Sequence, residues 1–287
     1  MIKKYSNLVV LSHTIFALPF AMVGYSYALT STSAEFEWQI LVQVLLCMLF
    51  ARNTAMGFNR WADRNIDKEN PRTASREIPA GAISPRAALL FVTLNVALFI
   101  ATTATINHLT LILSPIALLI IMGYSYCKRF TALAHLVLGL GLAIAPVGAY
   151  IAVTGEFATL PCLLALVVMT WCGGFDIIYA LQDREFDRER GLHSIPSKFS
   201  VREALGISIA LHAVTAIALI AFGVLLEGAA WWIWVGIGVF LILLTAQHIL
   251  VTPTRQRNIG IAFGTLNGIA SLVFAIFTIS ALFFPHK

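Results

Sequence analysis

Two pairs of aspartates are the side chains of this sequence best suited to chemistry. Asp63 and Asp67 fall within the stretch N-R-W-A-D-R-N-I-D. Asp183 and Asp187 follow them by 120 residues, within Y-A-L-Q-D-R-E-F-D. Residues four apart on a helix share one face, so each pair would place two carboxylates side by side. Mg²⁺ prefers carboxylate oxygens and completes its coordination with phosphate oxygens, so the spacing predicts two facing clusters that hold a metal-bound diphosphate. The alternative is a pair of solvated helix ends with ordinary charge pairs.

Two charged residues lie deeper in the apolar runs that precede these clusters. Asp176 comes seven residues before Asp183 and would add a third inward carboxylate. Arg52 comes seven residues before Asn59, about two helical turns away on a similar face. An arginine inside an apolar span needs an anion or a cavity, so we expect Arg52 to face an anionic group. The alternative is a side chain that extends until its guanidinium reaches water.

Two interpretations are possible for each of three further basic or titratable residues. Lys128 and Arg129 directly follow an apolar run, where they could neutralise a diphosphate or simply anchor the chain at the membrane surface. His13 lies within the first apolar run. It is either a contact inside a helical bundle or part of a functional site.

The composition indicates that these side chains are positioned by the helices of a membrane protein. Of the 287 residues, 59% are hydrophobic and only 11% are charged, whereas about a quarter of the residues of soluble domains carry charge. Apolar runs of about 20 residues are long enough to span a bilayer as helices. The sequence therefore predicts an all-α bundle of nine transmembrane helices. The nine runs are near 8–30, 38–58, 86–106, 109–126, 132–153, 160–181, 203–225, 230–250 and 259–284.

The distribution of charge predicts the orientation of this bundle. A net charge of +5 would suggest a nucleic-acid partner if the basic residues were spread over one surface, but they are confined to alternate loops. The intervening loops contain Glu35, Glu37, Glu156 and Glu227 and no lysine or arginine. Basic loops stay on the cytoplasmic side, so both aspartate pairs are expected there, and no nucleic-acid partner is expected.

The sequence around the aspartates indicates an internal repeat. Each pair is followed by basic residues and then by Ile-Pro, at 78–79 and again at 195–196. The pairs end the second and the sixth apolar run, so the repeat keeps its orientation, unlike the inverted repeats of many transporters. We expect one domain over 1–287, with repeated four-helix halves at about 1–130 and 131–250 and a final helix at 259–284.

Over nearly its whole length the chain resembles the UbiA superfamily of intramembrane prenyltransferases. The motifs that carry the resemblance are N-R-W-A-D-R-N-I-D at 59–67, N-P-R-T-A-S-R at 70–76, K-R-F-T at 128–131 and D-I-I-Y-A-L-Q-D-R-E-F-D at 176–187. Within the superfamily, the last motif and Y-S-Y-C-K-R-F-T are most similar to the 4-hydroxybenzoate polyprenyltransferases. The stretches S-H-T-I-F-A-L-P-F-A and A-R-N-T-A-M-G-F-N-R resemble a branch assigned to menaquinone synthesis through futalosine.

The resemblance implies a reaction and a role for particular residues. A polyprenyl group would pass from polyprenyl diphosphate to a hydroxylated aromatic acid through an allylic cation, with Mg²⁺ as cofactor, in quinone biosynthesis at a bacterial inner membrane. Asp176 and Tyr179 would shape the acceptor pocket, and Arg52 and His13 would contact the acceptor. The implied metal ligands are Asn59, Asp63, Asp67, Asp183 and Asp187. The implied catalytic residues are the four aspartates of this set together with Asp176 and Tyr179. The implied diphosphate contacts are Asn59, Arg64, Lys128, Arg129 and Lys198.

Several alternatives to this assignment stay open. The acceptor could instead be a dihydroxynaphthoate, as menaquinone synthesis requires. A CDP-alcohol phosphotransferase also uses aspartates and Mg²⁺ in a membrane, but its D-G-x-x-A-R signature is absent. Haem O and chlorophyll synthases transfer to larger acceptors. A transporter is the main non-enzyme alternative, and the parallel repeat and the position of the acids away from the bilayer midplane argue against it. The oligomeric state is not indicated by any of these features.

Overall fold

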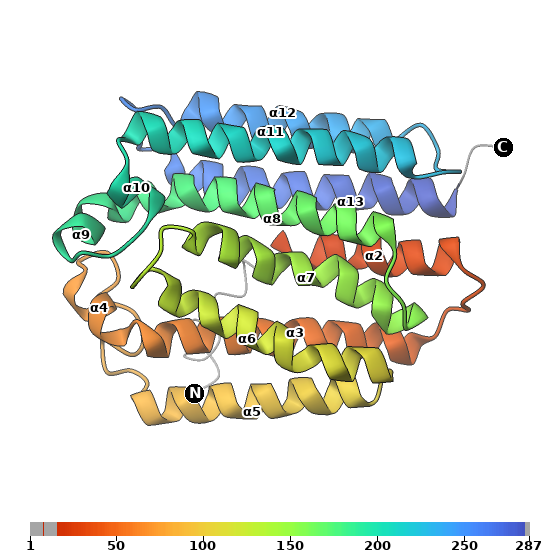
Figure 1. Ribbon diagram of the computed structural model, residues 1–287, viewed down its shortest axis with the longest axis horizontal. Coiled ribbons are helices and arrows are strands. Elements are labelled where there is room, and N and C mark those ends of the chain that lie inside the picture. The colour runs from red at the N-terminus through yellow and green to blue at the C-terminus, as the bar shows by residue number, and fades with distance from the viewer. Residues whose placement is uncertain (1–7, 9–15, 285–287) are drawn as a thin grey trace.

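The computed structural model describes Leu8 and residues 16–284, and this part of the chain is built from helices with no β-strand. The long helices run side by side along one axis (Figure 1). They are α2 (Leu18–Ser31), α3 (Trp38–Ala62), α5 (Pro85–Ala104), α6 (His108–Cys127), α7 (Ala134–Thr154), α8 (Thr159–Ala180), α11 (Val201–Leu225), α12 (Ile233–Leu250) and α13 (Asn267–Phe283).

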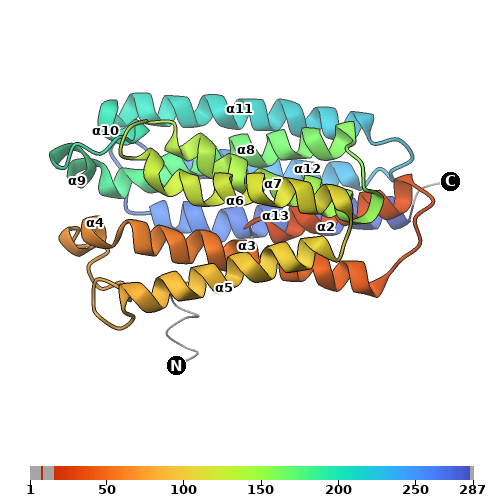
Figure 2. The same cartoon turned by 60° about the horizontal axis from the view of Figure 1, so that its bottom comes forward.

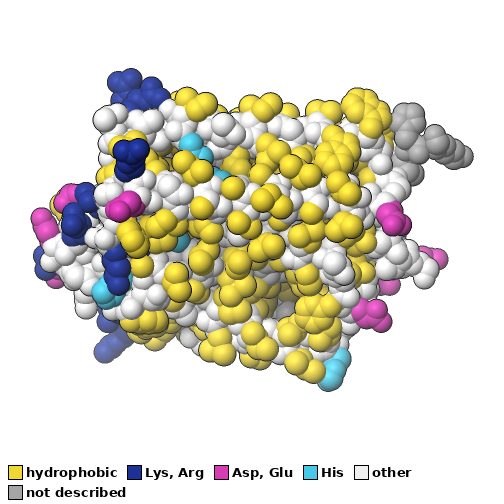
Figure 3. Space-filling view, turned by 45° about the horizontal axis from the view of Figure 1, so that its top comes forward, with side chains coloured by type: hydrophobic (Ala, Val, Ile, Leu, Met, Phe, Trp, Pro, Cys, Tyr) yellow, Lys and Arg dark blue, Asp and Glu magenta, His cyan; other side chains and the backbone are white. Residues whose placement is uncertain are grey.

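Eight candidate membrane spans are present among the described residues, so the chain is an integral membrane protein. They coincide with eight of the nine predicted apolar runs. The predicted run 8–30 overlaps with α2, which has 14 residues, while His13 lies outside the described residues. Hydrophobic side chains cover the middle of the molecule, and lysine and arginine gather at one end (Figure 3). This separation is what a bilayer requires of the lipid-facing surface.

Short helices at the basic end of the bundle hold the two aspartate motifs (Figures 1 and 2). Helices α4 (Arg64–Glu69) and α9 (Arg184–Glu189) have six residues each, and Asp63 and Asp183 precede them with nearly equal backbone angles of φ −93°, ψ 6° and φ −102°, ψ 4°. The 3₁₀ turn η2 (Leu181–Asp183) and helix α10 (Ile195–Lys198) complete this end. The repeated sequence therefore folds into a repeated local structure.

The helix is interrupted at each motif, which the spacing alone did not predict. Asp63 lies between α3 and α4, so its backbone leaves ideal helical angles. The Asp67 amide nevertheless donates to the Asp63 carbonyl at 2.7 Å. The four-residue spacing of the carboxylates is thereby kept while the direction of the chain changes.

The core of the bundle surrounds α8. Trp171 is fully buried and packs against Phe16, Phe20 and Phe240, and its indole N–H donates to Asn267 Oδ1 at 2.8 Å. Helix α7 approaches α8 so closely that a Cβ at Gly139 would lie 2.2 Å from the Met169 carbonyl oxygen. Glycine is therefore required there, and this contact fixes α8, which ends at the second aspartate motif.

Candidate active site

The first aspartate of the first motif is held by a residue of α3 and by a residue that follows α6. Asp63 Oδ2 accepts a hydrogen bond from Asn59 Nδ2 at 3.0 Å, and Asp63 Oδ1 accepts one from Arg129 Nη2 at 3.1 Å. Arg129 follows α6, and the same Nη2 atom also donates to the Ala62 carbonyl at 2.9 Å. Three of the residues singled out from the sequence are thus in direct contact.

The second aspartate of this motif is buried, and only one of its two carboxylate oxygens accepts a hydrogen bond. Asp67 Oδ1 accepts from Arg76 Nη1 at 2.7 Å, whereas Oδ2 is buried and has no hydrogen-bond partner among the residues that the structure describes. Burial raises the pKa of Asp67 to about 6, and burial also raises the pKa of Asp63. Burying a carboxylate oxygen without a hydrogen-bond donor costs free energy, unless a bound ligand supplies the missing interaction.

A loop of the first half holds the first aspartate of the second motif. Asn70 Nδ2 and Arg72 Nε donate to Asp183 Oδ1 at 2.9 and 2.8 Å, and a second guanidinium nitrogen of Arg72 pairs with Asp183 Oδ2. This two-point contact fixes the plane of the carboxylate. Arg72 Nη1 also donates to the Tyr179 hydroxyl at 3.2 Å, and the Tyr179 ring lies 4.2 Å from that of Phe263. The two motifs therefore meet in space.

Lys128 lies among the acids of both halves. Its Nζ is 3.7 Å from Asp187 Oδ2, which also accepts from Ser194 Oγ at 2.9 Å. Burial alone would lower the pKa of Lys128, but the negative charges of Asp187, Asp176 and Asp183, together with that of Asp63, outweigh this effect and raise it. Lys128 is therefore charged, and it marks the point at which the aspartates converge.

Asp176 has a partner that was not anticipated. Its Oδ2 lies 2.6 Å from Nδ1 of His135, a fully buried residue in the first turn of α7. The backbone N–H of Ile195 donates to His135 Nε2 at 3.3 Å. No local pattern marked His135 as a site residue. Asn70 and Arg72 fall within the N-P-R-T-A-S-R motif that carried the family resemblance, but neither was assigned a role from the sequence.

Two predicted diphosphate contacts lie apart from the acids. Arg64 donates to the Trp61 carbonyl at 2.7 Å, and its guanidinium carbon is 4.9 Å from the centre of the Trp61 ring. Lys198 is exposed in the last turn of α10. Either side chain would have to reorient to reach the carboxylates.

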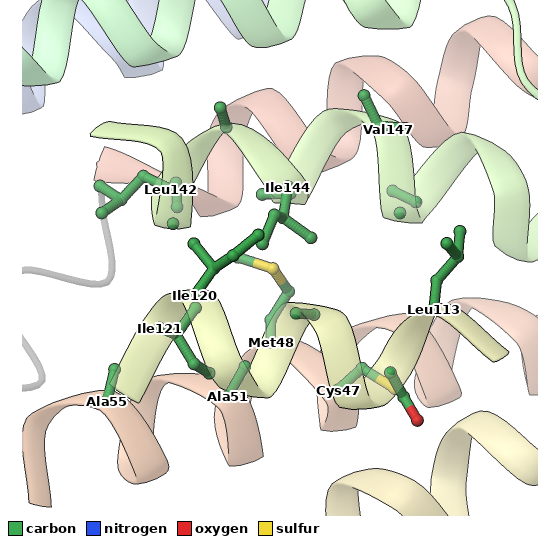
Figure 4. A pocket seen from close by; sticks show the side chains of 18 of the residues that line it. Cys47, Met48, Ala51, Ala55, Leu113, Ile120, Ile121, Leu142, Ile144 and Val147 are labelled. Carbon is green, nitrogen blue, oxygen red and sulfur yellow. The ribbon is translucent and has the colours of Figure 1, made fainter. Parts of the chain in front are cut away.

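An apolar cavity of about 400 Å³ lies between α3, α6 and α7 (Figure 4). Met48 and Ile120 project into it from α3 and α6, and Ile144 projects from α7. Arg52 and Tyr124 also line this cavity. Arg52 is on α3, which ends just before Asp63, and Tyr124 is on α6, which ends just before Lys128. The cavity therefore extends inward along the helices that lead to the charged site.

The donor set at the charged end fits a hard divalent cation. Carboxylates of both motifs and the Asn59 side chain gather there, and the buried Oδ2 of Asp67, without a partner among the described residues, is available. Within the described part of the chain, no three acidic, histidine or cysteine side chains form a metal site on their own. Mg²⁺ typically takes only one or two carboxylates and completes its octahedron with phosphate oxygens and water, so a diphosphate would have to supply the remaining ligands.

A cluster of charged side chains at one end of a membrane bundle, on the same helices as an apolar cavity, is the arrangement that an amphiphilic anion requires of a membrane protein. The sequence profile of the UbiA prenyltransferase family matches residues 17–273, and the chain belongs to this family. It is therefore a prenyltransferase. This finding confirms the resemblance seen in the sequence.

Comparison with individual proteins agrees with the family assignment. The chain is 30% identical over 249 residues to a protein of Aliivibrio fischeri named 4-hydroxybenzoate octaprenyltransferase, with 86% of each chain covered. A UbiA homologue from Aeropyrum pernix K1, solved without ligand, is 32% identical, has a TM-score of 0.79, and is matched over 94% of this chain and 97% of its own. A UbiA homologue from Archaeoglobus fulgidus bound to GPP and Mg²⁺ shares the fold with a TM-score of 0.75, at 24% identity and with 97% and 99% covered.

Proposed function

We propose that the chain transfers a polyprenyl group from polyprenyl diphosphate to a hydroxylated aromatic acid such as 4-hydroxybenzoate, with Mg²⁺ as cofactor. The observation that carries this proposal is the convergence of both aspartate motifs around Lys128, next to an apolar cavity. The name of the Aliivibrio fischeri relative and the GPP and Mg²⁺ of the Archaeoglobus fulgidus homologue support it.

The charged residues would act on the diphosphate. Mg²⁺, when bound, would supply positive charge that stabilises the leaving group. The residues that would hold it are Asn59, Asp63, Asp67, Asp183 and Asp187. Lys128 and Arg129 would stabilise the negative charge that develops as the bond between the diphosphate oxygen and the allylic carbon breaks. Arg64 and Lys198 are retained as proposed diphosphate contacts, which they would reach after reorientation.

The remaining residues would act on the hydrocarbon and the acceptor. The cavity between α3, α6 and α7 would take the prenyl chain and keep water from the allylic cation. The cation would then alkylate the aromatic ring ortho to its phenolic oxygen. Asp176 and Tyr179 would border the acceptor, Arg52 would bind its carboxylate, and His13 would be a further contact of the acceptor.

We further propose the finer architecture that the sequence suggested. In this proposal residues 8–30 form a ninth span, and 1–287 is one domain with parallel four-helix halves. The matching angles before α4 and α9 support the repeat. The aspartates would face the cytoplasm of a bacterial cell from the inner membrane, because the basic residues gather at their end of the bundle.

Mass spectrometry of the products tests the proposed function. Membranes containing the protein, supplied with geranyl diphosphate, Mg²⁺ and 4-hydroxybenzoate, should form geranyl hydroxybenzoate and release diphosphate. A parallel reaction with dihydroxynaphthoate tests the alternative acceptor. A transporter would bind substrate and release no diphosphate, and that result would overturn the proposal.

Arg52→Ala should raise the KM for the aromatic acid about tenfold or more, because a charge-assisted hydrogen bond to the acceptor is lost. The KM for the prenyl diphosphate should stay close to that of the wild type. Initial rates measured with each substrate varied in turn will separate the two constants. A change confined to the KM for the diphosphate would contradict the proposed contact.

The affinity for Mg²⁺ should fall as the pH drops below about 6. Burial raises the pKa of Asp67 from 3.8 to about 6, so between these values the folded chain binds a proton that the unfolded chain has lost. The metal-free protein therefore loses stability as the pH rises through this window. Mg²⁺ requires the carboxylate, so one competing proton weakens its binding by about tenfold per pH unit. Titration of Mg²⁺ at several pH values measures this, and a constant affinity from about pH 5 to 7 would contradict it.

A further inference from the structure

The structure fixes the tautomer of the buried His135. Nε2 of this ring accepts the backbone N–H of Ile195 at 3.3 Å. A backbone N–H can only donate, so Nε2 carries no proton, and the neutral ring must carry its proton on Nδ1. Nδ1 lies 2.6 Å from Asp176 Oδ2 and therefore donates to that carboxylate. His135 itself is fully buried, so water does not compete for either contact.

The segment that orients His135 is tied to the diphosphate end of the site. Ser194 caps α10, whose first residue is Ile195, and its Oγ donates to Asp187 Oδ2 at 2.9 Å. The neighbouring backbone N–H of His193 donates to the Lys128 carbonyl at 2.7 Å. The two residues that lead into Ile195 are thereby held in place, and with them the Ile195 amide. The orientation of His135 is built into the scaffold of the active site.

Asp176 lies at the depth where the acceptor ring would be expected. On α8 it precedes Asp183 by seven residues, which is about 10 Å along a helix. Arg52 on α3 precedes Asp63 by eleven residues, so it lies about one helical turn deeper relative to its motif than Asp176 does. Tyr124 of α6 interacts electrostatically with both Arg52 and Asp176. The Asp176 side chain is 19% exposed, so unlike His135 it can reach a ligand.

Asp176 also differs chemically from the other four aspartates. Each of those pairs with an arginine or a lysine. Those four are also the aspartates proposed to hold Mg²⁺, which would occupy their oxygens. Asp176 instead accepts a hydrogen bond from a neutral imidazole. It is not among the proposed metal ligands, so it is the aspartate at this end that stays available to take a proton.

We infer that Asp176 is the base that removes the ring proton and that His135 is the positioning residue that aims it. This inference rests on the proposed function. The bond between the allylic carbon and the diphosphate oxygen breaks, and its electron pair leaves with the diphosphate. A pair of ring electrons forms the new carbon–carbon bond. The ring carbon then loses its hydrogen as a proton to the Asp176 carboxylate, the electrons of that bond restore aromaticity, and Asp176 returns the proton to water after the product leaves.

The inference is tested by kinetics with 4-hydroxybenzoate that carries deuterium at both positions ortho to the hydroxyl group. In the wild type, proton loss is fast and deuterium should leave the rate unchanged. Asp176→Asn should lower kcat about 10²-fold or more, and His135→Leu should lower it about tenfold or more. In both variants the deuterated acceptor should react more slowly, because proton removal now limits turnover. His135→Asn keeps a neutral N–H near the position of Nδ1, so it should retain most of the wild-type activity and show no isotope effect.

The outcomes separate this inference from the proposed function. If Asp176→Asn or His135→Leu is slow but insensitive to deuterium, the pair is only structural and the inference is overturned. Equal losses in His135→Leu and His135→Asn would also overturn it. Thermal unfolding and the KM for geranyl diphosphate, measured for each variant, identify a misfolded protein, and His135→Asn then provides the decisive comparison. A wild type that forms no prenylated product would instead overturn the proposed function.

Discussion

Asp183→Asn should reduce Mg²⁺-dependent turnover on the order of 10³-fold or more while leaving the chain folded. Asp183 is proposed to bind Mg²⁺, and it is also the residue through which the first half contacts the second. Asparagine keeps its shape but has one oxygen and no charge. It can neither bind a metal as strongly nor accept both donors of Arg72.

Glu185→Gln is the matched control for this prediction. Glu185 lies two residues further on, its side chain is 74% exposed, and it pairs with Arg184 rather than with a residue of the other half. Loss of an exposed ion pair of this kind should change turnover by no more than about twofold. Prenyl transfer and melting temperature are measured for both variants in the same detergent. Near-normal activity of Asp183→Asn would refute the proposed metal site.

Lys128→Met should lower kcat on the order of 10² to 10³-fold, with a smaller change in the KM for the prenyl diphosphate. Methionine keeps the length of the side chain and removes its charge. That charge would be needed most when the diphosphate leaves, because negative charge then accumulates on its oxygen. The change also leaves the buried Asp187 without its cation.

Lys198→Met provides the comparison for Lys128. Both lysines were predicted from the sequence to contact the diphosphate, but Lys198 is exposed at the end of α10. Lys198 would reach the diphosphate only after reorientation, so steady-state kinetics should show a much smaller loss for Lys198→Met than for Lys128→Met. Losses of the same size in both variants would mean that the position of Lys128 among the acids has no special importance.

Much of the site could be predicted because its chemistry repeats along the chain. The recurrence of two aspartates at one offset, each pair at the end of an apolar run, was enough to expect that they face each other. The partners of these acids were harder to find. Arg72 and Asp183 are 111 residues apart, and a contact over such a distance depends on tertiary packing rather than on local spacing. His135 was missed for the same reason, since its two partners come from α8 and α10.

The positions of the helices could be predicted from the apolar runs, but the residues at which the helices begin and end could not. The run predicted over 38–58 continues to Ala62, because the polar residues of the motif extend the helix beyond the apolar region. The last predicted helix begins with a π-helical turn at Ile261–Leu266. There the Asn267 side chain donates to the Ala262 and Phe263 carbonyls and accepts from Trp171 and Gln247, so buried hydrogen bonding alters the helix.

The direction of the contacts between the two aspartate motifs has a consequence for any attempt to rebuild the site. Arg72 and Lys128, both from the N-terminal part of the chain, neutralise Asp183 and Asp187. Advancing Lys128 by the 120-residue offset between the aspartates leads to His248, so no lysine stands at the corresponding later position. The surroundings of the two motifs are therefore not interchangeable, and a chain in which one motif and its flanking residues replaced the other would lack the charge balance of this site.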